Sequence, residues 1–205
     1  MRILALLAGL LLAVGAAQAN THTRGDDPQA LVQSVAEQVL AELKKDKADL
    51  EAHPEHINDI VDRYIIPHVD FQRMARWVLG KHWRRATPEQ RKRFVEEFKR
   101  LLVRTYATSL LEYTDQTLTF LPFRGDPARG DVTVRSQIDQ PGGFPVPIDY
   151  KLHRSKDGRW LIYDIVIDGV SLVSNYRSSF AREIARKGID GLIETLAEKN
   201  QSGGA

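Results

Sequence analysis

The segment VIDGVSLVSNYRSSF, residues 166–180, decides the fold because a strand passes into a helix there within a few residues. The strand ends at Ile167, and the Asp168-Gly169 pair is typical of a turn. From Ser171 onward apolar residues recur at helical spacing, which predicts a helix whose apolar side packs against the sheet. These inward-facing residues are Val173, Tyr176 and Phe180. The junction is either a corner of the fold or the rim of a binding site.

The residues before this corner alternate between apolar and polar side chains, which is typical of strands. The expected strands occupy residues 117–121, 132–139, 144–152 and 160–167. The Asp157-Gly158 pair favours a tight hairpin before the last strand. The sequence therefore predicts a twisted antiparallel meander over residues 115–168. The last strand is apolar on both faces, so we expect other elements to cover it on both sides.

Helices are predicted on either side of this sheet. A capping residue followed by proline, as at Asp27-Pro28 and Thr87-Pro88, is typical of a helix start. The expected helices run from Pro28, from after Pro54 to Pro67, over about residues 70–79, from Thr87 to about Tyr113, over residues 171–187 and over residues 190–199. The predicted plan is one α+β domain over residues 20–205, mainly helical at 28–113, with the sheet at 115–168 and closing helices at 171–199.

The N-terminus has the features of a Sec-type signal peptide. Arg2 supplies a positive charge, residues 3–14 form an apolar run, and residues 17–19 are an A-x-A cleavage signature. The apolar run is too short for a permanent transmembrane helix. We expect cleavage near Ala19, which removes residues 1–19 and leaves the mature protein in the periplasm. An uncleaved N-terminal anchor is the alternative.

The composition excludes several function classes. The chain contains no cysteine, which excludes disulfides, thiolate catalysis and cysteine-ligated metal sites. Its 29 Lys and Arg nearly balance 27 Asp and Glu, and loss of Arg2 brings the balance closer to zero, so a nucleic-acid partner is not indicated. The segment KHWRRATPEQRKR, residues 81–93, is locally basic. It contacts anionic headgroups or an acidic partner, or it is simply a solvated helix start.

Motifs for metal binding and nucleotide binding are missing. The sequence lacks HExxH, G-x-S-x-G and a phosphate-binding glycine loop. His53 and His56 are close in sequence, but Pro54 favours a helix start between them. We expect the two imidazoles to point to opposite sides of that start and to bind no metal. The sequence therefore predicts neither a metal nor a cofactor.

Asp164 is the most enzyme-like residue. It lies mid-strand among apolar residues, and alternation places it on the same face as Trp160 and Ile162. A carboxylate in an apolar pocket can act as a general base. The alternative, which we favour, is an ion pair with an arginine such as Arg177 that fixes the closing helix to the sheet. Because the sequence offers no oxyanion-stabilising partner for Asp164, we expect no enzymatic activity.

Several short motifs, taken together, resemble those of a known family. They are Val78-Leu79-Gly80 with Trp83, Gln90-Arg91 with Phe94 and Phe98, Thr105-Tyr106-Ala107 with Tyr113, and Gly169-Val170-Ser171-Leu172 with Asn175-Tyr176-Arg177. In this order and spacing, from about Pro28 to Leu196, the chain resembles the periplasmic phospholipid-binding proteins of the maintenance-of-lipid-asymmetry pathway, also called the toluene-tolerance family.

The resemblance implies an NTF2-like sheet with helices that enclose a deep hydrophobic cavity for phospholipid acyl chains. It implies a shuttle between an outer-membrane lipoprotein–porin complex and an inner-membrane ABC transporter that carries an MCE-domain ring, in the service of outer-membrane lipid asymmetry. It implies no catalysis and no cofactor apart from the bound phospholipid cargo. We expect a monomer that binds no nucleic acid.

The aliphatic and aromatic stripes then become candidate lining for acyl chains between the long helix, the third helix and the sheet, although each stripe alone is more typical of a core than of a pocket. The candidates are Met74, Val78, Phe98, Leu101, Leu102, Thr105, Tyr106, Leu110, Phe144, Val146, Ile148, Tyr150, Ile162, Val166, Val173 and Tyr176. Arg177 either meets the lipid phosphate or forms a structural ion pair, which we favour. An enzyme that uses Asp164 and a solid-cored periplasmic adaptor are the alternative functions.

Overall fold

The computed structural model describes residues 27–113, 116–139 and 142–202, so the expected signal peptide at residues 1–19 lies outside the described residues. Helix α1 (Pro28–Lys45) begins where it was predicted. The Asp27 carboxylate accepts hydrogen bonds from the backbone N–H groups of Gln29 at 2.8 Å and Ala30 at 3.2 Å. This cap satisfies two of the N–H groups that the first turn of a helix leaves without partners.

The segment after α1 is more broken than the single helix that the sequence predicted. A short helix α2 (Lys47–Ala52), which was not predicted, follows α1 directly. The chain then forms the 3₁₀ turn η1 (Pro54–His56), helix α3 (Ile57–Ile60), the π-helical turn η2 (Val61–Ile65) and the 3₁₀ turn η3 (Ile66–His68). Single π-helical turns are rare and often lie at functional sites.

Helices α4 (Phe71–Leu79) and α5 (Pro88–Tyr106) confirm two predicted helix starts. Asp70 accepts a hydrogen bond from the backbone N–H of Arg73 at 2.8 Å. Thr87 and Gln90 form a reciprocal capping box with bonds of 3.1 and 2.9 Å. The 3₁₀ turn η4 (Gly80–His82) follows α4. The predicted continuation of the long helix is wrong, because η5 (Thr108–Tyr113) is a separate 3₁₀ turn.

In the described part of the chain, five strands form one antiparallel sheet in sequence order, which confirms the predicted meander. They are β1 (Thr117–Phe120), β2 (Asp131–Asp139), β3 (Val146–Arg154), β4 (Trp160–Ile167) and β5 (Val170–Ser171), and the 3₁₀ turn η6 (Pro127–Arg129) precedes β2. Strand β3 begins two residues after the predicted position, so Phe144 lies before the ladder. A parallel bridge between Val69 and Ile162 ties the end of η3 to β4.

A β-bulge in β4 changes which residues share a face. Leu152 pairs with Ile162, and the adjacent Lys151 pairs with Asp164, so Tyr163 is the extra residue. Directly paired residues share a face of the sheet, whereas neighbours along a strand point to opposite faces. The predicted placement of Asp164 on the face of Ile162 is therefore wrong. Simple alternation fails here because one inserted residue reverses the order of the two faces.

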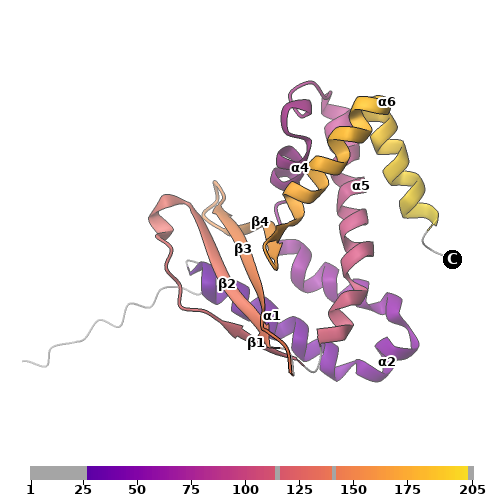
Figure 1. Cartoon of the computed structure of the whole chain (residues 1–205). Helices are drawn as coiled ribbons and strands as arrows, with labels where there is room; N and C mark the ends of the chain where they lie inside the picture. The colour runs from indigo at the N-terminus through magenta and orange to yellow at the C-terminus, as the bar shows by residue number, and fades with distance from the viewer. Residues whose placement is uncertain (1–26, 114–115, 140–141, 203–205) are drawn as a thin grey trace, which may run out of the picture.

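Helix α6 (Leu172–Ser202) consists of two limbs, as predicted. Gly188 has φ 74° and ψ −177°, a conformation that breaks the helix and that glycine adopts at low cost. Figure 1 shows the two limbs beside α4 and α5, with the second limb turning back along α5. The last described residues continue the second limb beyond its predicted end at Lys199.

The buried apolar residues that the structure describes fall into separate clusters. The three-helix core, between α4, α5 and α6, consists of Met74, Ala75, Val78, Leu79, Phe94, Phe98, Leu101, Leu102, Val173, Phe180, Ile184, Leu192, Ile193 and Leu196. The N-terminal cluster consists of Val39, Leu43, Leu50, Ile57, Ile60, Val61 and Ala107. The sheet cluster consists of Val32, Val132, Val134, Leu152, Trp160 and Ile162.

These clusters give the molecule two sides. In Figure 1 the sheet stands apart from the bundle of α4, α5 and α6, and α1 passes along the base of the sheet. Helix α1 joins two clusters, because Val32 packs in the sheet cluster whereas Val39 and Leu43 pack in the N-terminal cluster. On the other face, Tyr163 of β4 packs against the three-helix core. Strand β4 is thus covered on both faces, and the mixed α+β prediction is confirmed.

Candidate functional site

Many of the predicted lining residues lie inside the three-helix core. Met74, Val78, Phe98, Leu101, Leu102 and Val173 are buried there, and Tyr106 and Tyr176 pack against the cluster. The Phe98 ring lies 5.6 Å from Phe94, 5.3 Å from Tyr176 and 5.9 Å from Phe180, measured between ring centroids. Offset and edge-to-face contacts at these separations are favourable. Side chains therefore fill this region themselves.

Polar contacts between Tyr176 and two residues near the end of α5 lie beside the three-helix core. The Tyr176 hydroxyl interacts with Tyr106 and with Thr105, which is itself exposed. Burial, followed by the hydrogen bond with Tyr106, raises the pKa of Tyr176 well above its usual range. Thr105, which was predicted as a lining residue, thus contacts Tyr176 at the surface of the molecule beside the three-helix core.

The remaining predicted residues are distributed over the sheet and the N-terminal cluster. Ile148 and Ile162 are buried in the sheet, whereas Val146 and Val166 are half-buried. Leu110 packs against the N-terminal cluster, and Tyr150 packs against the sheet cluster. Phe144 is 94% exposed, which corrects its predicted inward orientation. It points outward because it precedes β3 and is not held by the pleat of that strand.

Half-buried apolar residues pack at the edge of the N-terminal cluster and at the edge of the sheet cluster. We call this set the apolar boundary: Ile65, Ile66, Leu110 and Leu111 from η2, η3 and η5, and Phe120, Tyr150 and Ile165 from the sheet. The Val69–Ile162 bridge fixes the end of η3 against β4 and so keeps Ile66 near the sheet. A single domain usually has one contiguous core. A boundary with half-exposed apolar faces on both sides is a candidate lipid site.

Tyr150 carries a polar group into this boundary. Burial raises the pKa of its hydroxyl, and a hydrogen bond with Ser136 opposes that shift. Ser136 is itself buried on β2 and donates to the Ile148 carbonyl oxygen at 3.5 Å. The hydroxyl of Tyr150 is therefore satisfied within the sheet, which leaves its ring as apolar surface. Five residues of the apolar boundary were missed from the sequence: Ile65, Ile66, Leu111, Phe120 and Ile165.

Asp164 fixes the start of α6 to the sheet. Its carboxylate accepts hydrogen bonds from the backbone N–H of Val173 at 3.1 Å, the Ser171 hydroxyl at 2.7 Å and the Lys151 ammonium at 3.0 Å. The first two bonds satisfy groups at a helix N-terminus, where negative charge is also favourable. The structural role that we favoured from the sequence therefore agrees with these contacts, but the partner is Lys151, not Arg177.

Arg177 lies at the surface beside a glycine. A Cβ placed on Gly80 would lie 3.1 Å from the Nε and Nη2 atoms of Arg177, so the guanidinium rests against this backbone. Within residues 27–113, 116–139 and 142–202, no ion pair or hydrogen bond of Arg177 is present. The favoured structural ion pair is therefore wrong, because the bulge in β4 directs Asp164 toward Lys151.

Comparison with known proteins settles the family. A family model described as MlaC protein matches residues 33–198. The chain belongs to the MlaC family. It is 30% identical to the toluene tolerance protein ttg2D of Pseudomonas putida, over 98% of this chain and 92% of that protein. It is 26% identical to the intermembrane phospholipid transport system binding protein MlaC of Haemophilus influenzae, over 83% of this chain and 81% of that protein.

A solved structure agrees with the MlaC family assignment. A phospholipid-binding protein from Ralstonia solanacearum, determined in complex with a phospholipid, superimposes with a TM-score of 0.79. The two sequences are 37% identical, and the match covers 87% of this chain and 99% of that one. The resemblance inferred from the sequence motifs is thereby confirmed. No helix in the described part of the chain combines the length and apolar character needed to cross a membrane.

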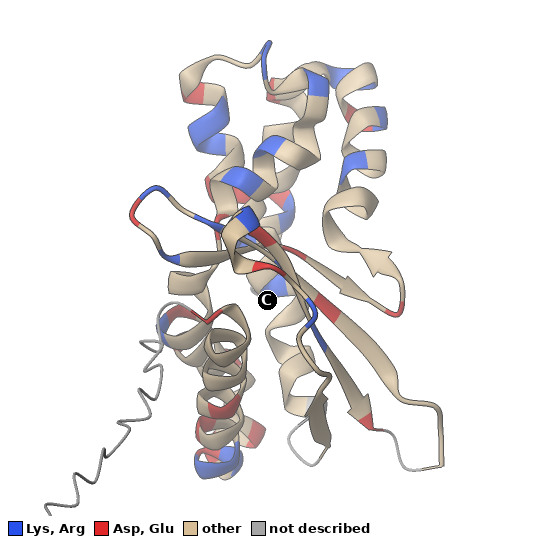
Figure 2. Cartoon of the chain, turned by 90° about the vertical axis from the view of Figure 1, so that its left-hand side faces the viewer, with Lys and Arg blue, Asp and Glu red and all other residues tan. Residues whose placement is uncertain are grey.

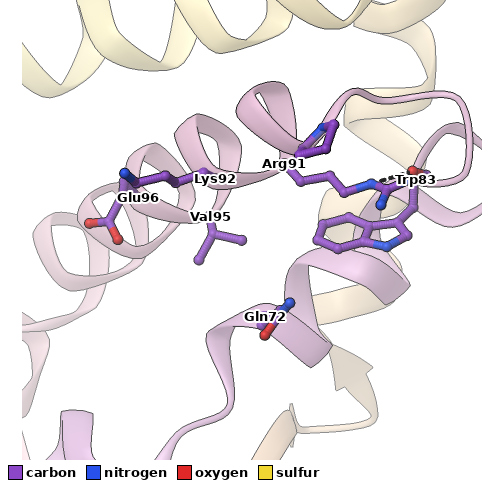
Figure 3. A pocket seen from close by; sticks show the side chains of 7 residues that line it. Gln72, Trp83, Arg91, Lys92, Val95 and Glu96 are labelled. Carbon is purple, nitrogen blue, oxygen red and sulfur yellow. Dashed lines mark hydrogen bonds between the residues drawn. The ribbon is translucent and has the colours of Figure 1, made fainter.

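A shallow pocket in this MlaC-family chain lies outside every predicted lining residue. It has a volume of about 430 Å³ and is lined by Gln72, Trp83, Pro88, Arg91, Lys92, Val95 and Glu96 (Figure 3). Arg91 donates from Nε to the Trp83 carbonyl oxygen at 2.9 Å and lies 5.3 Å from the indole centroid. These contacts hold the Arg91 guanidinium over the ring. Charged side chains of Arg91, Lys92 and Glu96 thus take part in the lining of the pocket, which a channel for acyl chains would not need.

Four of the seven residues that line the pocket, Trp83, Pro88, Arg91 and Lys92, lie in the basic segment 81–93. Exposed cations of this segment include Lys81, Arg84, Arg85, Lys92 and Arg93. Figure 2 shows Lys and Arg predominating at the end of the molecule where α5 begins. A surface of this kind attracts anionic groups at long range, and salt weakens that attraction. Both sequence-based alternatives for this segment, a contact with an anionic partner and a solvated helix start, fit its exposure.

Proposed function

We propose that this protein is a phospholipid carrier whose acyl chains lie at the apolar boundary. The observation that carries the proposal is the family assignment combined with half-buried apolar faces on the helical side and the sheet side. The phospholipid in the Ralstonia solanacearum structure supports a lipid cargo. The protein performs no chemical step on this cargo, and the contacts of Asp164 with Lys151, Ser171 and Val173 are those of a structural carboxylate.

Transfer free energy requires that the acyl chains be enclosed. Exposure to water costs about 0.8 kcal/mol per methylene, so two chains of roughly sixteen carbons cost on the order of 20 kcal/mol. A carrier must supply an equivalent apolar surface. The three-helix core has already used its apolar surface, because its aromatic rings contact one another directly. The apolar boundary retains surface that a lipid can cover.

The boundary can open while the packed clusters stay intact. The N-terminal cluster and the sheet cluster are packed separately, and α1 and the Val69–Ile162 bridge connect them. Movement of the sheet away from η2 and η5, with the Val69–Ile162 bridge still holding the end of η3 against β4, therefore separates faces that are only half-buried, whereas Phe98 and its neighbours keep their contacts. Acyl chains then fill the space that opens, and the cost of separating the two faces is offset by their burial.

Lipid extraction tests the cargo directly. The mature protein is purified without detergent, extracted with organic solvent and examined by mass spectrometry. We expect phospholipid in amounts comparable to the protein. A folded sample that yields no phospholipid overturns the proposed function and favours a solid-cored adaptor.

A pair of tryptophan variants tests the position of the acyl chains. Ile165→Trp adds volume at the apolar boundary, whereas Val95→Trp adds the same kind of side chain at a half-buried position of α5 beside the three-helix core. We expect Ile165→Trp to lower the phospholipid-to-protein ratio and Val95→Trp to leave it unchanged. If Val95→Trp alone lowers the ratio, the lipid lies on the helical side.

We propose further that the carrier works in the periplasm between two membrane complexes. The family resemblance supports an inner-membrane ABC transporter with MCE domains as one partner and an outer-membrane lipoprotein–porin complex as the other. The test is transfer of labelled phospholipid between vesicles that contain each purified complex. Transfer that is equally fast without the carrier contradicts the proposal. The basic segment 81–93 is the candidate contact for an acidic partner face, and salt should then weaken the complex.

A further inference from the structure

Metal-ligating side chains gather where α2 ends and η1 begins. His53, Glu55 and His56 each offer a ligand atom, and these atoms all lie within 4.8 Å of one another. All three side chains are exposed. This arrangement differs from the sequence-based expectation, which placed the two imidazoles on opposite sides of a helix start. The expectation is wrong: the rings stack, with centroids 5.1 Å apart and an interplanar angle of 25°.

The 3₁₀ geometry of η1 explains why the imidazoles meet. A 3₁₀ helix has three residues per turn, so side chains at positions i and i+3 lie directly above one another. His53 caps η1 and His56 ends it, which gives them this spacing. Pro54 at the first position of the turn fixes its own φ and so favours this conformation. The sequence HPEH therefore forms a small two-imidazole clamp in the folded chain.

Asp49 orients the clamp from α2. Its Oδ2 lies 2.7 Å from Nδ1 of His56, and its backbone oxygen accepts a hydrogen bond from the N–H of His53 at 2.7 Å. A histidine that binds a metal almost always donates its other ring N–H to a carboxylate or carbonyl group. With Nδ1 of His56 engaged by Asp49, Nε2 of that ring is the ligand atom. Glu55 lies 3.5 Å from Nδ1 of His53 and supplies the carboxylate oxygen.

We propose that His53, Glu55 and His56 bind a divalent transition metal ion such as Zn²⁺, with Asp49 as the positioning residue and water in the fourth position. Imidazole and carboxylate are ligands that Zn²⁺ accepts, and bond lengths near 2.0–2.2 Å bring tetrahedral ligand atoms to roughly 3.3 Å from one another. The exposed side chains reach that separation by rotation. The bound ion ties His53, the C-cap residue of α2, to two residues of η1, and this segment lies in sequence between Leu50 and Ile57, which are buried in the N-terminal cluster.

Titration of Zn²⁺ into the mature, untagged, metal-free protein tests the site. We expect one ion per chain by isothermal titration calorimetry, and a higher melting temperature with Zn²⁺ present. His53→Gln and His56→Gln should each weaken binding by more than about tenfold, and Asp49→Asn by about tenfold. His82→Gln is the matched control, because His82 lies in another 3₁₀ turn away from this cluster, and it should bind like the wild type.

The outcomes separate this site from nonspecific binding. Absence of a one-to-one phase in the wild type overturns the proposal, as does equal binding by the wild type and His56→Gln. A loss of binding in His82→Gln equal to that in His53→Gln also overturns it. Circular dichroism of each variant confirms folding, which is expected because Asp49, His53 and His56 are exposed and His82 is only half-buried. The result does not depend on the lipid, so it leaves the proposed carrier function unaffected.

Discussion

The three-helix core and the apolar boundary are built from similar residues but are packed in opposite ways. In the three-helix core, Phe94, Phe98 and Phe180 contact one another and are buried. At the apolar boundary, Ile65, Ile66 and Ile165 are only half-buried. The same chain therefore keeps one region closed by mutual side-chain packing and leaves the other with apolar surface in reserve. This difference fits the proposed carrier function, in which a rigid region holds its shape while another accepts the cargo.

The largest effect on stability is expected in the three-helix core. Phe98→Ala removes a fully buried ring with three aromatic neighbours, so it should lower the free energy of unfolding by about 3–5 kcal/mol. Urea denaturation of the lipid-free protein measures this change. Lipid bound per folded molecule should stay at the wild-type level. A mild loss of stability with a large loss of lipid would place the cargo in this core and reverse the comparison.

The next largest effect is expected at the junction that joins the two regions. Asp164→Ala removes the acceptor for Val173, Ser171 and Lys151, and should lower the free energy of unfolding by about 2–3 kcal/mol. Ser171→Ala is the matched control, since it removes one of these donors and should cost about 1 kcal/mol. Equal unfolding free energies for Asp164→Ala and the wild type would show that α6 is held to the sheet by other contacts.

A smaller effect on stability is expected at the apolar boundary, with a larger effect on lipid. Ile165→Ala should lower the free energy of unfolding by about 1–2 kcal/mol, less than a core substitution because Ile165 is half-buried. The difference in unfolding free energy between lipid-loaded and lipid-free samples should be smaller in the variant than in the wild type, because the variant offers the lipid less apolar surface to cover. If lipid stabilises both proteins equally, Ile165 lies outside the lipid site.

Sequence patterns predicted most of the element boundaries, whereas the lining residues that they indicated remain a prediction. The capping residues Asp27 and Thr87 and the Asp157-Gly158 turn act within a few residues, so local chemistry was sufficient. An apolar stripe on a helix shows only that the stripe is buried. It does not show whether the stripe meets another helix or a lipid. For this reason Met74 and Phe98 were predicted as lining and lie in the three-helix core.

The remaining errors have local causes that periodicity cannot detect. The bulge at Tyr163 reverses the faces of β4, which misplaced Asp164 and, through it, the partner of Arg177. The 3₁₀ turn after His53 brings two imidazoles together that a regular helix start would separate. Each case is a local departure from a regular repeat: one extra residue in a strand, or a turn with three residues in place of 3.6. The sequence gives no strong signal for such a change.

The smallest effect on stability is expected at Arg177, on the outer edge of the three-helix core. Arg177→Ala should change the free energy of unfolding by less than about 0.5 kcal/mol, because its side chain is exposed and rests against Gly80. Gly80→Ala, by contrast, should cost about 1 kcal/mol, since Gly80 has a φ of 53° and its new Cβ would crowd the guanidinium. The double variant Gly80→Ala, Arg177→Ala measures how much of that cost comes from crowding between the new Cβ and the Arg177 guanidinium. Recovery of stability in the double variant supports the contact, and an unchanged cost assigns it to the backbone conformation alone.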